Sequence, residues 1–74
     1  MTLAEAEPGM FYTVARLGGE RRFLSRITAV GLTEGCRLKV LQNRRKRPVL
    51  VHARDSVLAL DRDDCARIDV EVAA

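Results

Sequence analysis

Five short runs of apolar and β-branched residues, separated by turn signals, constrain the fold of this chain more than any other feature. Each run is long enough for one short strand, and several alternate apolar with polar residues, as in a strand with one buried face. Five such strands in 74 residues cannot fill two sheets. We therefore expect a mostly-β domain in which one small, strongly bent sheet closes into a partly open barrel. The runs lie at residues 10–17, 36–43, 48–54, 55–60 and 68–72.

The second and third runs are joined by the polar segment RRKR, which predicts an antiparallel hairpin. Pro48 opens the third run, where it costs no hydrogen bond of the sheet. The alternation also predicts which side chains of the second and last runs are buried. These are Cys36, Leu38, Val40, Ile68, Val70 and Val72.

The segment ERRFLSRITAVGL changes to the spacing of three and four residues that is typical of an amphipathic helix. It predicts a helix over about residues 20–30, packed over one end of the barrel, with Phe23, Ile27 and Val30 buried. Gly31 is expected to end this helix, because glycine adopts the left-handed conformation without a steric penalty from a Cβ atom.

A second helical turn is expected in DRDDCARI, residues 61–68. The carboxylate of Asp61 is predicted to cap it by accepting from the free N–H groups of its first turn. Asp63 and Asp64 then lie at the positive end of the helix dipole, which stabilises them.

The length of the chain predicts one domain over residues 8–74, preceded by a flexible leader at residues 1–7. The leader has no basic start followed by an apolar run, as a signal peptide would have. No stretch approaches the ~20 apolar residues of a membrane span. We therefore expect a cytoplasmic protein.

A search for reactive groups is nearly empty, which predicts neither a catalytic residue nor a bound cofactor. His52 is the only histidine, and no phosphate-binding or nucleophile motif is present. Cys36, His52 and Cys65 are separated by 16 and 13 residues, without the close pairs of a structural zinc site. The two cysteines are expected to be buried thiols, with a disulfide as the alternative.

Charge is distributed unevenly along the chain. Residues 36–54 carry a net charge of +7 and residues 55–74 a net charge of −4. Arg44 to Arg47 are predicted to project into solvent, because four cations cannot lose their water without as many partners. The basic block has two open interpretations: it attracts an anionic partner, nucleic acid included, or the acidic C-terminal block neutralises it. Base stacking requires nearby aromatic residues, and none follows Phe23.

Three segments together resemble the FeoA family, small cytosolic proteins of bacterial ferrous-iron transport. They are RITAVGLTEG at 26–35, VLQNRRKRPVLV at 40–51 and LALDRDDCARIDV at 58–70. The resemblance covers residues 8–72 and rests on the order and spacing of turn glycines and core aliphatic residues. The chain departs from the family at Glu34, where proline is typical, at Cys65, where alanine is common, and at RRKR, where glycine often precedes the proline.

The resemblance implies an SH3-like barrel with no catalytic residue and no cofactor. It also implies a cytosolic adaptor or regulator that binds the cytoplasmic GTP-binding part of FeoB, a membrane ferrous-iron transporter. A groove between loops and helix would hold an apolar segment of the partner, anchored by Leu24, Leu32 or Leu58. Arg44 to Arg47 would face an acidic partner surface or an anionic membrane.

Two alternatives stay open. The chain is a small basic nucleic-acid-binding module of SH3-like fold, or it is a detached SH3-like domain of an iron-responsive repressor.

Overall fold

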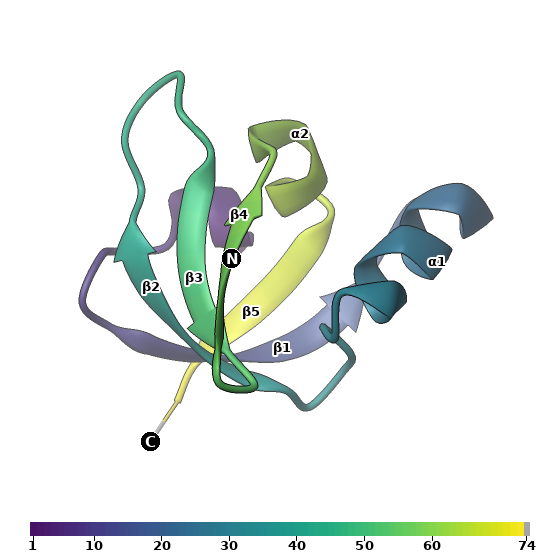
Figure 1. The fold of residues 1–74 in the computed structure, drawn as a ribbon, viewed down its shortest axis with the longest axis horizontal. Helices are drawn as coiled ribbons and strands as arrows, with labels where there is room; N and C mark the ends of the chain where they lie inside the picture. The colour runs from purple at the N-terminus through teal and green to yellow at the C-terminus, as the bar shows by residue number, and fades with distance from the viewer. Residues whose placement is uncertain (74) are drawn as a thin grey trace.

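One antiparallel sheet of five strands organises residues 1–73, the part of the chain that the computed structural model describes (Figure 1). The strand order is β4-β3-β2-β1-β5, and the edge strands β4 and β5 are not paired with each other. The fold is therefore the expected SH3-like arrangement, with a bent sheet that is not closed. The strands are β1 (Phe11–Leu17), β2 (Arg37–Gln42), β3 (Val49–Ala53), β4 (Ser56–Leu60) and β5 (Ile68–Val72); the helices are η1 (Leu3–Glu5), α1 (Arg21–Ala29) and α2 (Arg62–Cys65).

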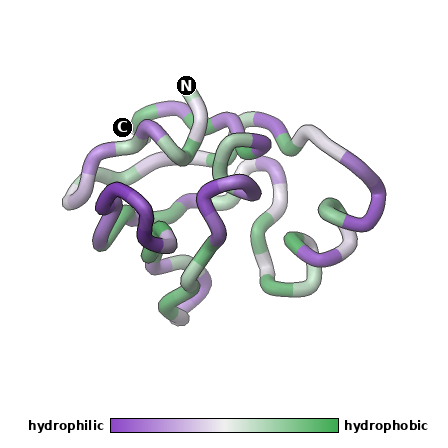
Figure 2. Tube along the Cα trace, turned by 90° about the horizontal axis from the view of Figure 1, so that it is seen from above, coloured by the Kyte–Doolittle hydropathy of each residue, from purple (hydrophilic) through white to green (hydrophobic). Residues whose placement is uncertain are grey.

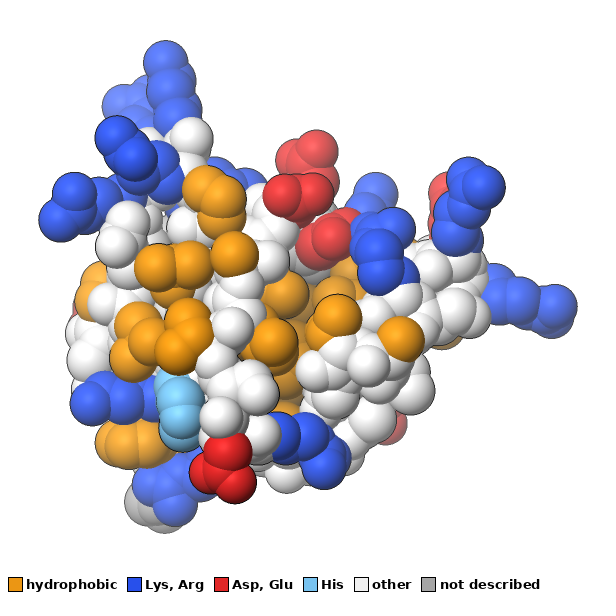
Figure 3. All heavy atoms as spheres, in the orientation of Figure 1, with side chains coloured by type: hydrophobic (Ala, Val, Ile, Leu, Met, Phe, Trp, Pro, Cys, Tyr) orange, Lys and Arg blue, Asp and Glu red, His pale blue; other side chains and the backbone are white. Residues whose placement is uncertain are grey.

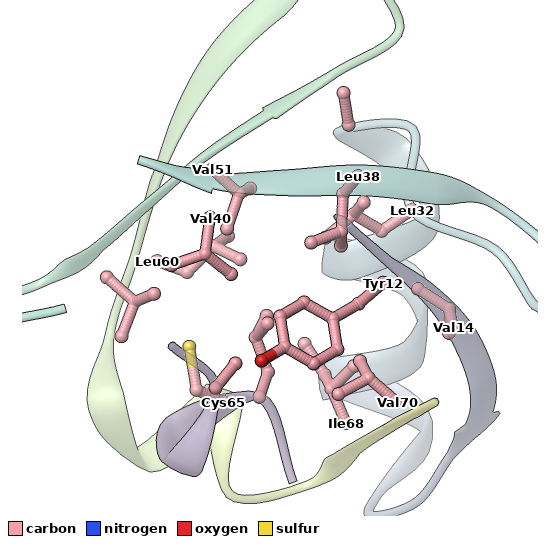
Figure 4. Close-up of a cluster of buried hydrophobic side chains, with 14 of the residues drawn as sticks. Tyr12, Val14, Leu32, Leu38, Val40, Val51, Leu60, Cys65, Ile68 and Val70 are labelled. Carbon is pink, nitrogen blue, oxygen red and sulfur yellow. The ribbon is translucent and has the colours of Figure 1, made fainter. Parts of the chain in front are cut away.

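The predicted alternation in β2 is confirmed, and β3 alternates in the same way, so that both strands fill the inside of the bent sheet with aliphatic side chains. Figure 4 shows the ring of Tyr12 in the middle of this core, surrounded by aliphatic residues. Its hydroxyl accepts a hydrogen bond of 2.9 Å from the backbone N–H of Glu7. Tyr12 thus fills the middle of the core with its ring, and its buried hydroxyl has a hydrogen-bond partner.

Strands β3 and β4 are joined by a two-residue turn formed by Arg54 and Asp55. Both residues have positive φ, 50° and 63°, as in the type I′ turn that matches the twist of a hairpin. The side chain of Arg54 donates from Nε to the carbonyl oxygen of Gly31 at 2.6 Å, which fixes this turn against the end of α1.

Helix α1 ends as the sequence predicts. Gly31 has φ +101°, and its N–H donates to the carbonyl of Thr28 while that of Leu32 donates to Ile27. This is the pairing of a Schellman motif, with Ile27 and Leu32 both buried. No helix within residues 1–73 is long and apolar enough to cross a membrane.

The prediction that Val30 is buried is wrong. Phe23 and Ile27 enter the core, but Val30 is 45% exposed. Val30 is the C-cap residue, one position beyond the last helical residue, where the chain already turns toward Gly31. The helical spacing that placed it on the apolar face no longer applies there.

Two predictions at the C-terminal end also need correction. Val72 is 59% exposed because it lies at the end of an edge strand, with no further strand beside it in the described part of the chain. Asp61 occupies the N-cap of α2, but its side chain makes no capping hydrogen bond. Only its backbone carbonyl accepts, from the N–H of Cys65 at 3.0 Å.

Residues 1–7 pack onto the domain, which corrects the prediction of a flexible leader. Leu3 is completely buried, and the backbone N–H of Val70 donates to the carbonyl of Met1 at 2.8 Å. Thr2 forms a bridge with Asp69, so this segment covers part of the free edge of β5. A single helical turn has no periodicity that a sequence pattern would reveal, and its burial depends on contacts with the other end of the chain.

We expect Ile27→Ala to reduce the free energy of unfolding by roughly 2–5 kcal/mol, because it leaves a cavity beneath α1. The loss is a large part of the total stability of a domain of this size. Urea unfolding would measure it. Val30→Ala is the control: its side chain lies largely in solvent, so the change should stay within about 0.5 kcal/mol. Equal losses in both variants would show that the buried face of α1 is wrongly assigned.

Candidate interaction surfaces

The connection between β2 and β3 carries four consecutive cations at the end of a protruding hairpin (Figure 1). We call Arg44 to Arg47 the basic tip. All four residues are exposed, as predicted, and their side chains spread into solvent at the upper left of Figure 3. Lys46 has φ +63°, the conformation that glycine favours. The chain thus keeps a cation at a turn position that suits glycine.

Arg62, at the start of α2, holds the basic tip in place. Its Nη1 donates to the carbonyl oxygens of Arg44 and Arg47, at 2.7 and 3.0 Å. Its Nη2 donates to Oδ1 of Asn43 at 2.7 Å, and Nδ2 of Asn43 donates to the carbonyl of Ala6 at 2.8 Å. Sequence reasoning missed this role, because nothing in the local pattern connects α2 with a hairpin tip 15 or more residues away.

In the described residues, the acidic C-terminal block forms no ion pair with the basic tip. Asp64 pairs with Arg26 and Arg67, and Asp69 pairs with Arg16. Asp61 and Asp63 line a shallow depression beside Lys46 and Arg47, but no ion pair within residues 1–73 includes a residue of the tip. Of the two interpretations of the charge asymmetry, the structure supports a tip whose positive charge is available to a partner.

A groove separates α1 from the edge strand β4. Figure 2 shows α1 as an arm beside the body of the sheet, and Figure 3 shows the hollow between them, with apolar side chains inside. We call this hollow, of about 200 Å³, the α1–β4 groove. Ile27, Val30, Ala59 and Leu60 form its apolar lining, and charged side chains lie at its rim.

The leucines predicted to anchor a partner segment have different positions. Leu32 is completely buried, so in this conformation no partner can reach it and it cannot act as the predicted anchor. Leu24 and Leu58 are half-buried and pack against the core. None of the three lines the α1–β4 groove. The accessible apolar residues there are Ala59 and Val30, and sequence reasoning had placed Val30 in the core.

A buried carboxylate joins α1 to α2 beside this groove. Asp64 is nearly inaccessible and accepts from Nη2 of Arg26 at 2.8 Å and from Nη1 of Arg67 at 3.4 Å. Both guanidinium groups also lie about 6 Å from the centre of the Phe23 ring, within range of cation–π attraction. Asp64 lies in the first turn of α2, as predicted, and it also makes a specific pairing across the fold that the sequence did not predict.

Strand pairing brings an aromatic residue to the basic strand β2. Phe11 is 43% exposed and lies directly opposite Lys39. The guanidinium carbon of Arg37 lies 4.7 Å from the centre of its ring, and Nζ of Lys39 lies 5.5 Å from it. The sequence argument that no aromatic follows Phe23 overlooked this neighbour, because register between strands is not visible in linear order.

The candidate metal ligands are not brought together. Cys36 and Cys65 are free thiols inside the core, as predicted, and His52 lies on the outer side of β3. Within residues 1–73, no three side chains of His, Cys, Asp or Glu are placed to hold a metal ion. Burial raises the pKa of the Cys65 thiol to about 11. At neutral pH this cysteine is therefore a protonated apolar residue rather than a nucleophile or thiolate ligand.

Comparison with known proteins identifies one family. The model of the FeoA domain matches residues 1–72. No curated protein sequence matches the chain.

Solved structures share the fold. Iron(II) transport protein A from Clostridium thermocellum is 20% identical at a TM-score of 0.90, covering 97% of this chain and 45% of its own. The FeoA protein from Chlorobium tepidum is 28% identical at 0.88, covering 100% of this chain and 71% of its own. A manganese-dependent transcriptional repressor is 22% identical at 0.89, covering 100% of this chain and 41% of its own. The chain thus spans less than half of the first and last of these proteins.

We expect Arg62→Met to loosen the basic tip while leaving the core intact. The variant loses charge-assisted hydrogen bonds to backbone carbonyls, so unfolding free energy should fall by about 1–3 kcal/mol. Hydrogen exchange at the amide of Arg47, which donates to Arg44 at 3.1 Å, should accelerate. Arg22→Met, on the exposed side of α1, is the control and should change neither quantity. Unchanged exchange at Arg47 would refute the role of Arg62.

We expect Cys65 to make stability depend on alkaline pH. Its pKa is raised in the folded state, so the stabilisation is complete below the ordinary pKa of 9.0 and is lost as pH rises toward about 11. Urea unfolding should show a loss of about 2–3 kcal/mol over this range. Cys65→Ala should flatten this slope, whereas Leu60→Ala, which also removes buried atoms, should retain it. Parallel slopes in the parent protein and Cys65→Ala would contradict the assignment.

Proposed function

The chain belongs to the FeoA domain family, and from this premise we propose that it is a non-enzymatic accessory protein of ferrous-iron transport. In this proposal it acts in the cytoplasm and binds the cytoplasmic GTP-binding part of a FeoB-type membrane transporter. The family match over residues 1–72 is the observation that carries the proposal. A structural neighbour from Clostridium thermocellum bears the name iron(II) transport protein A, which names the same process.

Two surfaces support a binding role. The basic tip offers four exposed cations on a turn fixed by Arg62, so a partner need not order it on binding. The α1–β4 groove offers apolar contacts at Val30 and Ala59, with Arg26 at its rim. An acidic transporter surface would be attracted by the first and retained by an apolar segment in the second.

The basic tip and the α1–β4 groove would affect different rates of binding. Exposed charges act mainly on the rate of association, because they steer encounter over distances at which apolar contacts have no effect. Desolvated apolar contacts act mainly on dissociation, since they must be broken before the partner leaves. We therefore assign encounter to the basic tip and residence time to the α1–β4 groove.

One observation favours a second candidate function. Phe11 between Arg37 and Lys39 is an aromatic surface next to cations, as in proteins that stack single-stranded nucleic acid. Such proteins generally present several stacking residues along a groove. The described part of this sheet exposes a single aromatic side chain, Phe11. The repressor-domain alternative rests on a 22% identical neighbour, a likeness of fold alone.

We expect the quadruple change of Arg44 to Arg47 to serine to slow association with the transporter's cytoplasmic part without changing its dissociation. Val30→Asp should instead accelerate dissociation, because it places a charge in the apolar groove. Surface plasmon resonance at two salt concentrations would separate the rates. Arg21→Ser with Arg22→Ser is the charge control, since both residues lie on α1 away from the tip.

Two results would contradict the proposal. One is the absence of binding by a parent protein whose melting curve shows that it is folded. The other is a control variant that slows association by the same factor per charge removed as the quadruple variant, because only the net charge would then matter. Salt-dependent binding of labelled single-stranded oligonucleotides, lost in the quadruple variant, would favour the nucleic-acid alternative.

A further inference from the structure

The side of the sheet that faces away from the core combines apolar and basic side chains. Register places Phe11 opposite Lys39, Lys39 opposite His52, and His52 opposite Val57, so one row of side chains crosses four strands. A second pair, Leu50 and Ala59, lies next to this row. We call this surface the outer face. It consists of Phe11, Lys39, Leu41, Leu50, His52, Val57 and Ala59, with Arg37 at its margin.

The apolar residues of the outer face are unusually accessible. Val57 is 60% exposed and Leu41 is 41% exposed. Val57 and Ala59 belong to β4, an edge strand in which the sequence SVLAL carries no charge and no proline. Natural edge strands usually carry charges or prolines, so the outward apolar side chains of this strand lack the charged neighbours that such strands commonly have.

Cations lie at both ends of this apolar strip. Arg37 and Lys39 lie beside Phe11 at one end, and the basic tip extends from the other end of β2 and β3. Figure 3 shows this arrangement on the left side of the molecule: blue side chains above and below, with orange side chains and the pale blue histidine between them. Acids lie at the margins, with Asp55 beside His52 and Asp61 and Asp63 below the tip.

We propose that the outer face binds the surface of an anionic phospholipid bilayer. The cations of the basic tip and of β2 would contact lipid phosphates. The apolar strip with Val57 and Leu41 would reach the boundary between headgroups and acyl chains. Proteins that lie on membranes combine these two features, because apolar burial and attraction to anionic lipids add. The proposal goes beyond the proposed function, since it requires no transporter.

The composition of the outer face favours a bilayer over nucleic acid. Aliphatic side chains such as Leu41, Leu50 and Val57 cannot stack on bases, and Phe11 is the exposed aromatic of the row. The shape agrees as well, since the strip is an exposed strand surface rather than a channel along which a single strand would run. The fixed backbone of the basic tip holds its cations in one region, where they meet many headgroups at once.

Co-sedimentation with vesicles tests the proposal on the intact protein. We expect binding to vesicles of equimolar phosphatidylglycerol and phosphatidylcholine, weakened by salt, and no binding to phosphatidylcholine alone. Arg44→Ser with Arg45→Ser should reduce partitioning by about tenfold, because each cation near an anionic surface contributes several-fold. Arg21→Ser with Arg22→Ser removes the same charge from α1 and should have little effect.

A second pair of variants tests the apolar strip. Val57→Ser should weaken vesicle binding by about threefold, whereas Val72→Ser, at an equally exposed valine on the opposite edge strand, should not. Equal effects within either pair would overturn the proposal, because the face would then have no special role. Absence of binding to anionic vesicles, or tighter binding to polyuridylate than to these vesicles, would also overturn it. Each result is independent of transporter binding, which is measured without lipid.

Discussion

The guanidinium group of Arg62 fixes the part of the structure that the proposed functions use. It donates to the carbonyls of Arg44 and Arg47 and to the side chain of Asn43. Three segments far apart in the sequence thus meet at one side chain: α2, the β2–β3 hairpin and, through Asn43, the N-terminal turn that contains Ala6. The guanidinium group donates to neutral backbone carbonyls, where it takes the place of water. It therefore holds the backbone of the basic tip without neutralising the charges of the tip.

A second charged side chain holds the other half of the molecule. Asp64 binds Arg26 of α1 and Arg67 before β5, and both guanidinium groups lie near the Phe23 ring. A nearly inaccessible carboxylate with two cationic partners is costly to separate from them. The pairing therefore fixes the distance between α1 and the body of the sheet, and with it the width of the α1–β4 groove.

The strands could be predicted from the sequence because their side-chain alternation is a local property. The end of α1 at Gly31 could be predicted for the same reason, since a left-handed residue after an amphipathic run has a local steric cause. Val30 was misplaced because it lies one residue beyond α1, and Val72 because it is the last residue of the edge strand β5. The periodic pattern in the sequence continues to the last apolar residue, but a side chain is buried only as far as the neighbouring helix or strand covers it.

The candidate surfaces could be predicted only in part. Exposure of the basic tip could be predicted because four adjacent cations are visible in the sequence, and removing them from water would be costly. Arg62, Asp64 and the burial of Leu3 depend on contacts between distant segments, and the row from Phe11 to Val57 depends on strand register. A hydrophobic pattern identifies which residues of a strand share a side, but only pairing identifies the neighbours beside them.

The location of the two surfaces has a consequence for how they would act together. The α1–β4 groove and the outer face adjoin at edge strand β4, because Ala59 lines the groove and also belongs to the outer face. A membrane bound by the outer face would therefore place the groove at the margin of the contact, next to a partner at the same membrane. On the proposals made above, weak binding to lipid would raise the local concentration of the protein near a transporter. Two weak contacts would then give tight binding without a large interface.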